Sequence, residues 1–285
     1  MLYSELRFTS GDGRLTLYAR DYGGEGRSLL LMHGLTRNSA DFEALAAALA
    51  GKYRLIVPDQ RGRGLSEHDP DPAFYRPDVY AADMFALLAA LLVERPSVVG
   101  TSMGGLIALV MNALRPGCFA TAAFNDVGPV LSPEGLRRIG NYVGSTVSFA
   151  DLDEAAEVCA AINRHAFPEY GPEDWRAWAQ RTCREGPDKR LAFDYDPAIA
   201  QGFTDPGEKP DANLWPLWGL LGETPVLAIR GAHSDLLSPE TLAEMERRHA
   251  GPFASVTVPG RGHAPMLDEP EAIAGLRAFL EEHQS

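Results

Sequence analysis

Short β-rich runs alternate with helix-length segments in this 285-residue chain, and this alternation restricts the fold more than any other feature. Apolar runs such as 29–32, 55–57 and 97–99 are separated by the helix-length segments 40–50 and 77–93. Strand, helix and strand repeated in this way imply right-handed crossovers and a mostly parallel sheet. The run 29–32 lacks polar alternation, as expected of a central strand covered on both faces. The sequence therefore predicts an α/β fold with helices on both faces of the sheet.

Two regions of the chain depart from this alternation of strands and helices. Turn signals at residues 11–13 and 23–24 favour an antiparallel hairpin at one edge of the sheet. Between about Gly128 and Gly222, helix-like segments follow one another without a convincing strand alternation. We therefore predict a core made of residues 1–127 and 222–285, with residues 128–221 inserted as a helical cap.

Charge and composition exclude several classes of protein. Twenty-six Lys and Arg against 39 Asp and Glu give a formal net charge of −13, a field that repels phosphate backbones and anionic membranes. The longest apolar run, residues 84–93, is far shorter than the ~20 residues that cross a bilayer. The first twelve residues do not resemble a secretory signal. We expect a cytoplasmic location, a small-molecule substrate, no nucleic acid and no membrane, in a monomer or homodimer.

The segment Gly100–Gly105 carries the sharpest chemical signal. Its sequence Gly-Thr-Ser-Met-Gly-Gly contains the pattern G-x-S-x-G between a predicted strand at 96–99 and a predicted helix at 106–114. In that context the pattern is a nucleophile elbow, a tight turn that exposes the hydroxyl of Ser102 at the edge of the sheet. The following helix directs its positive end and the Met103 N–H toward negative charge that develops on a substrate.

A serine at its ordinary pKa is a poor nucleophile, so Ser102 needs a histidine base and a carboxylate that orients the imidazole. His263 lies in a loop after the last predicted strand, at the carboxyl edge where the elbow also lies. Asp235 follows the predicted strand 225–229 at the same edge, and we predict that it is the carboxylate. Asp126, at the end of the strand before the insertion, is the competing candidate.

The chain order Ser102, Asp235, His263 is that of α/β-hydrolases, and the sequence resembles the capped α/β-hydrolase superfamily over nearly its whole length. The resemblance implies that the Leu35 N–H joins that of Met103 in an oxyanion hole. It also implies that His33 and Gly34 shape the oxyanion loop. The motifs that carry it are His33-Gly34, the segment Asp59–Ser66, the elbow Gly100–Gly105, the segment Gly231–Asp235 and Gly262-His263.

The Asp59–Ser66 segment has a structural role in this interpretation. Its glycines permit close turns, and Arg61 and Arg63 can pair with Asp59 or with main-chain carbonyls. Aromatic residues of the predicted cap suggest a lid over an apolar pocket, with Trp175, Trp178 and Trp215 as candidate substrate contacts.

These residues predict a serine hydrolase that cleaves a small, mainly apolar ester or lactone through an acyl-enzyme. Two alternatives stay open, a C–C bond hydrolase of aromatic ring-fission products and a low-turnover ligand sensor on the same fold. No metal or other cofactor is expected, because the sequence has no H-E-x-x-H motif and no clustered ligand spacing.

Overall fold

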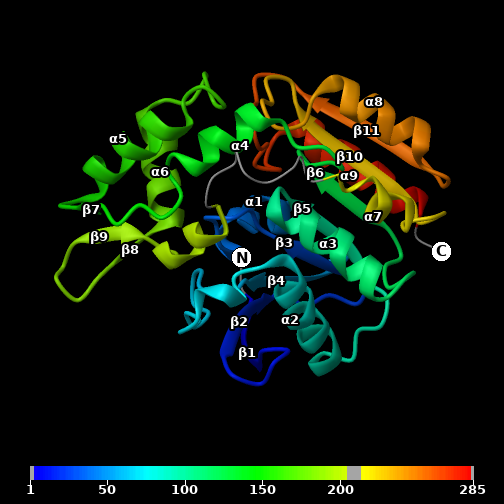
Figure 1. Ribbon diagram of the computed structural model, residues 1–285, viewed down its shortest axis with the longest axis horizontal. Coiled ribbons are helices and arrows are strands. Elements are labelled where there is room, and N and C mark those ends of the chain that lie inside the picture. The colour runs from blue at the N-terminus through cyan, green and yellow to red at the C-terminus, as the bar shows by residue number, and fades with distance from the viewer. Residues whose placement is uncertain (1–2, 204–212, 284–285) are drawn as a thin grey trace.

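The computed structural model describes residues 3–203 and 213–283, and an eight-stranded sheet runs through them (Figure 1). Its strand order is β1-β2-β4-β3-β5-β6-β10-β11. The hairpin of β1 and β2 is antiparallel and lies at one edge, β2 is antiparallel to β4, and the pairs from β4 onward are parallel. The predicted α/β fold with an edge hairpin is therefore confirmed. The strands are β1 (Ser4–Thr9), β2 (Thr16–Asp21), β3 (Ser28–Met32), β4 (Arg54–Asp59), β5 (Ser97–Thr101), β6 (Ala122–Asn125), β10 (Val226–Gly231) and β11 (Phe253–Val258).

Helices cover both faces of this sheet, as the uninterrupted apolar strands predict. Along β3, Leu30 and Met32 pack into the cluster on one face, and Leu29 and Leu31 pack into the cluster on the other. Figure 1 shows α2 and α3 in front of the sheet. The first face is covered by α2 (Pro77–Ala90), α3 (Met103–Leu114), α7 (Trp215–Gly219) and α8 (Pro239–Arg248), and the second by α1 (Glu43–Leu49) and α9 (Pro270–Glu282). In the described ranges, none of the helices combines the length and apolarity needed to cross a bilayer.

The chain between β6 and β10 leaves the main sheet and forms a separate group of elements, with α5 and α6 at the left of Figure 1. We call residues 128–221 the inserted segment; its residues 204–212 lie outside the described residues. Besides the predicted helices, the segment contains three short strands in the order β7-β9-β8, which form a second sheet that the sequence did not predict. Strands of two or three residues are too short to produce a detectable alternation. The elements are α4 (Pro133–Gly140), β7 (Ser148–Phe149), α5 (Leu152–Asn163), α6 (Pro172–Thr182), β8 (Cys183–Glu185) and β9 (Leu191–Phe193).

The inserted segment has a small aromatic core of its own. The ring of Phe167 lies 5.0 Å from that of Trp178 and 6.3 Å from that of Trp175, centroid to centroid, and both contacts are edge to face. Met266 from the loop before α9 packs into the same cluster. Aromatic pairs in such geometry stabilise packing by about 0.5–1.5 kcal/mol beyond the area they bury. This cluster therefore holds the inserted segment together and attaches it to the core.

Candidate active site

The turn between β5 and α3 has the geometry that the glycine-rich sequence predicts. Ser102 lies at φ 51° and ψ −113°, a conformation that L-residues rarely adopt and that is concentrated at functional sites. A Cβ on Gly104 would lie 2.1 Å from the carbonyl oxygen of Met32, and one on Gly100 would lie 2.4 Å from the backbone of Gly104. Only glycine allows β3, β5 and α3 to approach this closely. The turn presents the Ser102 side chain at the carboxyl edge of the sheet.

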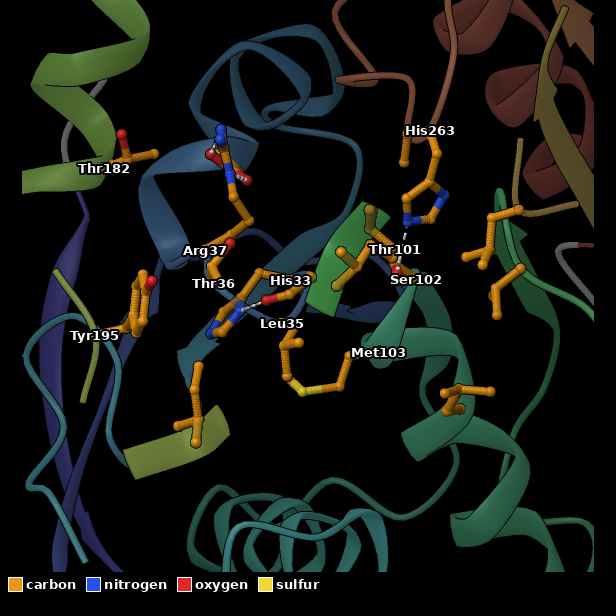
Figure 2. A pocket seen from close by; sticks show the side chains of 18 of the residues that line it. His33, Leu35, Thr36, Arg37, Thr101, Ser102, Met103, Thr182, Tyr195 and His263 are labelled. Carbon is orange, nitrogen blue, oxygen red and sulfur yellow. Dashed lines mark hydrogen bonds and ion pairs between the residues drawn. The ribbon is translucent and has the colours of Figure 1, made fainter. Parts of the chain in front are cut away.

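Three side chains form a continuous hydrogen-bonded chain at this edge. The Ser102 hydroxyl lies 2.9 Å from Nε2 of His263, as drawn in Figure 2. Nδ1 of His263 lies 2.8 Å from Oδ2 of Asp126. With the proton on Nδ1, the imidazole donates to the carboxylate and accepts from the hydroxyl. This is the arrangement in which a histidine can remove the serine proton.

The prediction that Asp235 is the carboxylate in contact with His263 is wrong, because Asp126 occupies that position. Asp235 instead forms a bidentate ion pair with Arg138 of α4, at 2.5 and 2.9 Å. Burial by itself would raise the pKa of Asp235, but the hydrogen bonds and charge of Arg138 outweigh it and hold that pKa below its ordinary value. The aspartate after β10 therefore connects the core to the inserted segment.

Asp126 is fully buried, and three donors surround its carboxylate. Oδ1 accepts the Gly231 N–H at 2.8 Å, and Oδ2 accepts the Ser234 hydroxyl at 2.6 Å in addition to His263. Buried carboxylates need such partners because an unpaired one costs several kcal/mol. The last residue of β10 and the loop after it, where the acid was expected, thus supply two hydrogen bonds to an acid that follows β6. The sequence contained this candidate but gave no means of ranking it above Asp235.

The predicted oxyanion residues lie around Ser102. Figure 2 shows Leu35 and Met103 beside Ser102 at the cavity. Throughout the described parts of the chain, the N–H groups of Leu35 and Met103 have no hydrogen-bond acceptor. Two free N–H groups beside a serine hydroxyl can receive a developing oxyanion.

His33 shapes the loop that carries Leu35. Its Nε2 accepts the Gln60 N–H at 3.0 Å, so Nδ1 carries the proton and donates to the Gly34 carbonyl at 2.7 Å. Burial lowers the pKa of His33, which keeps the ring neutral. Its position agrees with the loop-shaping role that the resemblance implies.

A cavity of about 280 Å³ lies in front of Ser102 and extends beneath the inserted segment. Of the three predicted tryptophan contacts, Trp178 lines it. Trp175 and Trp215 are not among the lining residues, so these two expectations are wrong. Trp175 packs in the aromatic core of the inserted segment. The guanidinium carbon of Arg248 lies 4.2 Å from the centre of the Trp215 ring.

One part of the cavity is apolar and another is polar. Apolar side chains from α3, α4 and the neighbouring loops line one part. The other part contains Arg37, whose Nε and Nη2 donate to Asp41 at 2.6 Å and whose guanidinium lies 3.9 Å from the Trp178 ring. Figure 2 shows Arg37 with Thr182 and Tyr195 on the side away from His263. The sequence analysis did not single out Arg37, which precedes the predicted helical segment 40–50, and its ion pair with Asp41 four residues later has no specific signature in the sequence. The apolar part comprises Leu106, Val127, Leu131, Leu136, Ile139 and Leu236.

Comparison with known proteins places this geometry in a family. Residues 29–276 match the model of the alpha/beta hydrolase family. The chain is 39% identical over 255 residues to a 3-hydroxybutyrate-oligomer hydrolase of Cupriavidus necator, covering 87% of this chain and 86% of the relative. It is 30% identical over 253 residues to a 2-(acetamidomethylene)succinate hydrolase of Mesorhizobium japonicum, covering 88% and 86%.

A crystal structure of an alpha/beta hydrolase from Novosphingobium aromaticivorans superposes with a TM-score of 0.91 at 42% identity and covers 98% of each chain. The match extends through the inserted segment as well as the sheet. The chain belongs to the alpha/beta hydrolase family and is an enzyme of the hydrolase type.

Proposed function

We propose that the protein is a serine hydrolase in which Ser102, His263 and Asp126 act as a catalytic triad on ester substrates. One observation carries this proposal, the unbroken hydrogen-bonded chain from the Ser102 hydroxyl through His263 to the buried carboxylate of Asp126. The strained backbone of Ser102 supports it, because the turn holds the hydroxyl at the cavity surface.

Each step of ester cleavage has a residue in position. Nε2 of His263 takes the Ser102 proton while Oγ attacks the carbonyl carbon, and the N–H groups of Leu35 and Met103 receive the oxyanion. When the tetrahedral intermediate collapses, the C–O bond breaks and His263 returns the proton to the leaving alcohol. A water molecule then attacks the acyl-enzyme, with His263 again as base, and releases the acid and free Ser102. The positive end of α3 adds to the stabilisation of the oxyanion.

For the substrate, we propose a small ester with an aliphatic part and a carboxylate, such as a short oligomer of 3-hydroxybutyrate. Such an oligomer is a chain of ester bonds with a carboxylate at one end. The two relatives are named for a hydroxybutyrate oligomer and a substituted succinate, both of which contain a carboxylate. The division of the cavity supports the same choice, since methyl-bearing chain fits the apolar part and a carboxylate fits beside Arg37.

Arg37 is held in a fixed orientation for this task. Asp41 occupies its Nε and Nη2, and Trp178 covers one face. Nη1 has no acceptor in the described portion of the chain, and the residue lines the cavity. A guanidinium with one free donor can bind a carboxylate oxygen while its pair with Asp41 lowers the cost of burying the charge.

The test combines active-site labelling with a matched pair of esters. A fluorophosphonate should label Ser102, located by mass spectrometry, and Ser102→Ala should lose labelling and reduce ester turnover to background while keeping the fold. Wild-type enzyme should cleave the 3-hydroxybutyrate dimer with a KM several-fold below that for its methyl ester. The double variant R37M/D41N, which leaves no unpaired carboxylate, should remove this preference and retain hydrolysis of p-nitrophenyl butyrate. Ester turnover retained by Ser102→Ala would refute the triad, and a preference retained by R37M/D41N would refute the carboxylate site.

A further inference from the structure

Arg63, in the turn after β4, is a fully buried arginine that touches both residues of the proposed oxyanion hole. Its Nε donates to the Leu35 carbonyl at 2.9 Å, and its Nη2 lies 3.7 Å from the Met103 sulfur. Sequence reasoning expected only a structural role here, with Asp59 or main-chain carbonyls as partners. The contact with Leu35 adds a connection to the site of reaction.

The charge of Arg63 has no carboxylate partner in residues 3–203 and 213–283. Its remaining contacts are the Arg61 carbonyl at 2.7 Å and the Tyr80 hydroxyl at 2.9 Å, both bound to Nη1. The rings of Tyr75 and Tyr80 lie 5.5 and 5.1 Å from the guanidinium carbon. All of these partners are neutral, so the cation is hydrogen-bonded without being neutralised.

Arg61, two residues earlier, shows what a neutralised buried arginine looks like in the same turn. It is also fully buried, but its guanidinium forms ion pairs with Asp83, Asp69 and Asp12 at 2.7, 2.6 and 3.1 Å. Asp59 pairs with neither arginine; it accepts the backbone N–H groups of Ser39 and Leu65. Three aspartates therefore neutralise Arg61, whereas Arg63 has no anionic partner among the described residues.

We propose that Arg63 is a positioning residue of the oxyanion hole and that its charge stabilises the oxyanion. This inference rests on the proposed function. The hydrogen bond to the Leu35 carbonyl fixes the backbone from which the Leu35 N–H projects. The guanidinium is fully buried, and electrostatic interactions are much stronger at a buried position than in solvent. Burying an unpaired cation is unfavourable in the resting enzyme, and the anion formed on the substrate supplies the missing counter-charge.

Two substitutions at Arg63 separate the effect of its hydrogen bonds from the effect of its charge. Arg63→Met keeps a similar length and removes both the charge and the hydrogen bonds, whereas Arg63→Lys keeps the charge and loses the planar fork. We expect kcat to fall by about 10- to 100-fold in R63M, below the ~10²–10³ typical of losing one direct oxyanion donor, with KM within threefold of wild type. R63K should recover part of the loss. Arg7→Met is the matched control, because exposed Arg7 donates to the carbonyl of Leu65 in the same turn without touching Leu35 or Met103.

A binding measurement distinguishes this role from a general loosening of the site. Ser102 Oγ adds to the carbonyl carbon of a trifluoromethyl ketone while its proton passes to His263, and the product is an anionic hemiketal. The corresponding secondary alcohol occupies the cavity without reacting. R63M should bind the ketone about 10- to 100-fold more weakly and the alcohol within twofold of wild type. Equal weakening of both ligands, or unchanged ketone binding in folded R63M, would overturn the proposal. The same result for R63K as for R63M would overturn the part assigned to charge.

Labelling identifies which proposal fails. If wild-type Ser102 does not react with the fluorophosphonate, the proposed function fails before Arg63 is considered. If wild type reacts and R63M reacts at the same rate, the triad stands and the role of Arg63 is overturned. Thermal unfolding of each variant verifies that the compared proteins are folded, and R63K provides the comparison if R63M does not fold.

Discussion

Two aspartates follow neighbouring strands at the same edge of the sheet, and they have different surroundings. Asp126, after β6, is fully buried and contacts His263, the Ser234 hydroxyl and a backbone N–H. Asp235, after β10, is partly exposed and pairs with Arg138 of the inserted segment. Strand order brings both to the site, but the path of the chain after each strand decides which of them the imidazole can reach.

The backbone after each strand explains the difference. Asp126 adopts a left-handed φ of 56° directly after β6, and its N–H donates to the Ile229 carbonyl on β10 at 2.7 Å. Three residues separate Gly231, the end of β10, from Asp235, and this carboxylate lies beside α4. Position at a strand end therefore identifies candidates for the acid, and burial with local donors selects between them.

Replacing each aspartate by asparagine is the strongest way to break this comparison. Asp126→Asn keeps the shape but removes the charge that stabilises the imidazolium and can favour the wrong tautomer of His263, so kcat should fall by about 10³–10⁴-fold. Asp235→Asn should change kcat less than threefold. Steady-state hydrolysis of p-nitrophenyl butyrate measures both. The reverse ranking would restore Asp235 as the acid.

A substitution at Ser234 measures how much a buried hydrogen bond to Asp126 contributes to catalysis. Ser234→Ala removes the hydroxyl that donates to Asp126 at 2.6 Å and that also accepts the Leu237 N–H at 3.1 Å. Leaving these buried groups short of a partner costs about 1–2 kcal/mol, so kcat/KM should fall by about tenfold. Ser132→Ala, at the N-cap of α4 where the side chain makes no capping bond, is the matched control. Equal kcat/KM for S234A and wild type would mean that His263 and the Gly231 N–H orient the carboxylate without the hydroxyl.

The site was predictable where a local signal was strong. The elbow around Ser102 and the loop that carries His263 follow from strand, turn and helix patterns that a single sequence displays. The choice between Asp126 and Asp235 depends on which loop turns back under the imidazole, a three-dimensional property with no local signature. The neutral surroundings of Arg63 are equally invisible, because Asp12, Asp69 and Asp83 all converge on Arg61 from distant positions.

The elements of the fold were likewise predictable only where the local sequence signal was strong. Apolar runs as long as 29–32 predict their strands, because burial on both faces leaves a clear pattern. The strands of the inserted segment are stabilised by packing against α5 and α6, and their two or three residues carry no periodicity. Trp175 and Trp178, one helical turn apart on α6, show the limit for the cavity: both are buried, but only Trp178 lines it.

Arg138→Met tests the other half of the comparison, the connection between the core and the inserted segment. The pair is largely buried, with side chains 19% and 20% exposed. Removing Arg138 leaves Asp235 without its bidentate partner, and we expect a loss of about 1 kcal/mol in the free energy of unfolding. Because α4 also lines the cavity, KM should rise about two- to threefold while kcat is unchanged. Urea unfolding and steady-state kinetics measure these effects; R137M, the same change at the neighbouring arginine of α4, should alter neither.

The smallest predicted effect is the pH dependence of this pair. The folded pKa of Asp235 lies below its ordinary value of 3.8, so the unfolded chain binds the proton more readily. The stabilisation from the pair is therefore fully present above the ordinary pKa and is lost as pH falls through the lowered one. The Tm of wild type should exceed that of Asp235→Asn at pH 7, and the difference should narrow as pH falls below about 4. A difference that stays constant down to pH 3 would mean that the charge of Asp235 contributes nothing, and that packing of α4 against the loop after β10 holds the inserted segment in place.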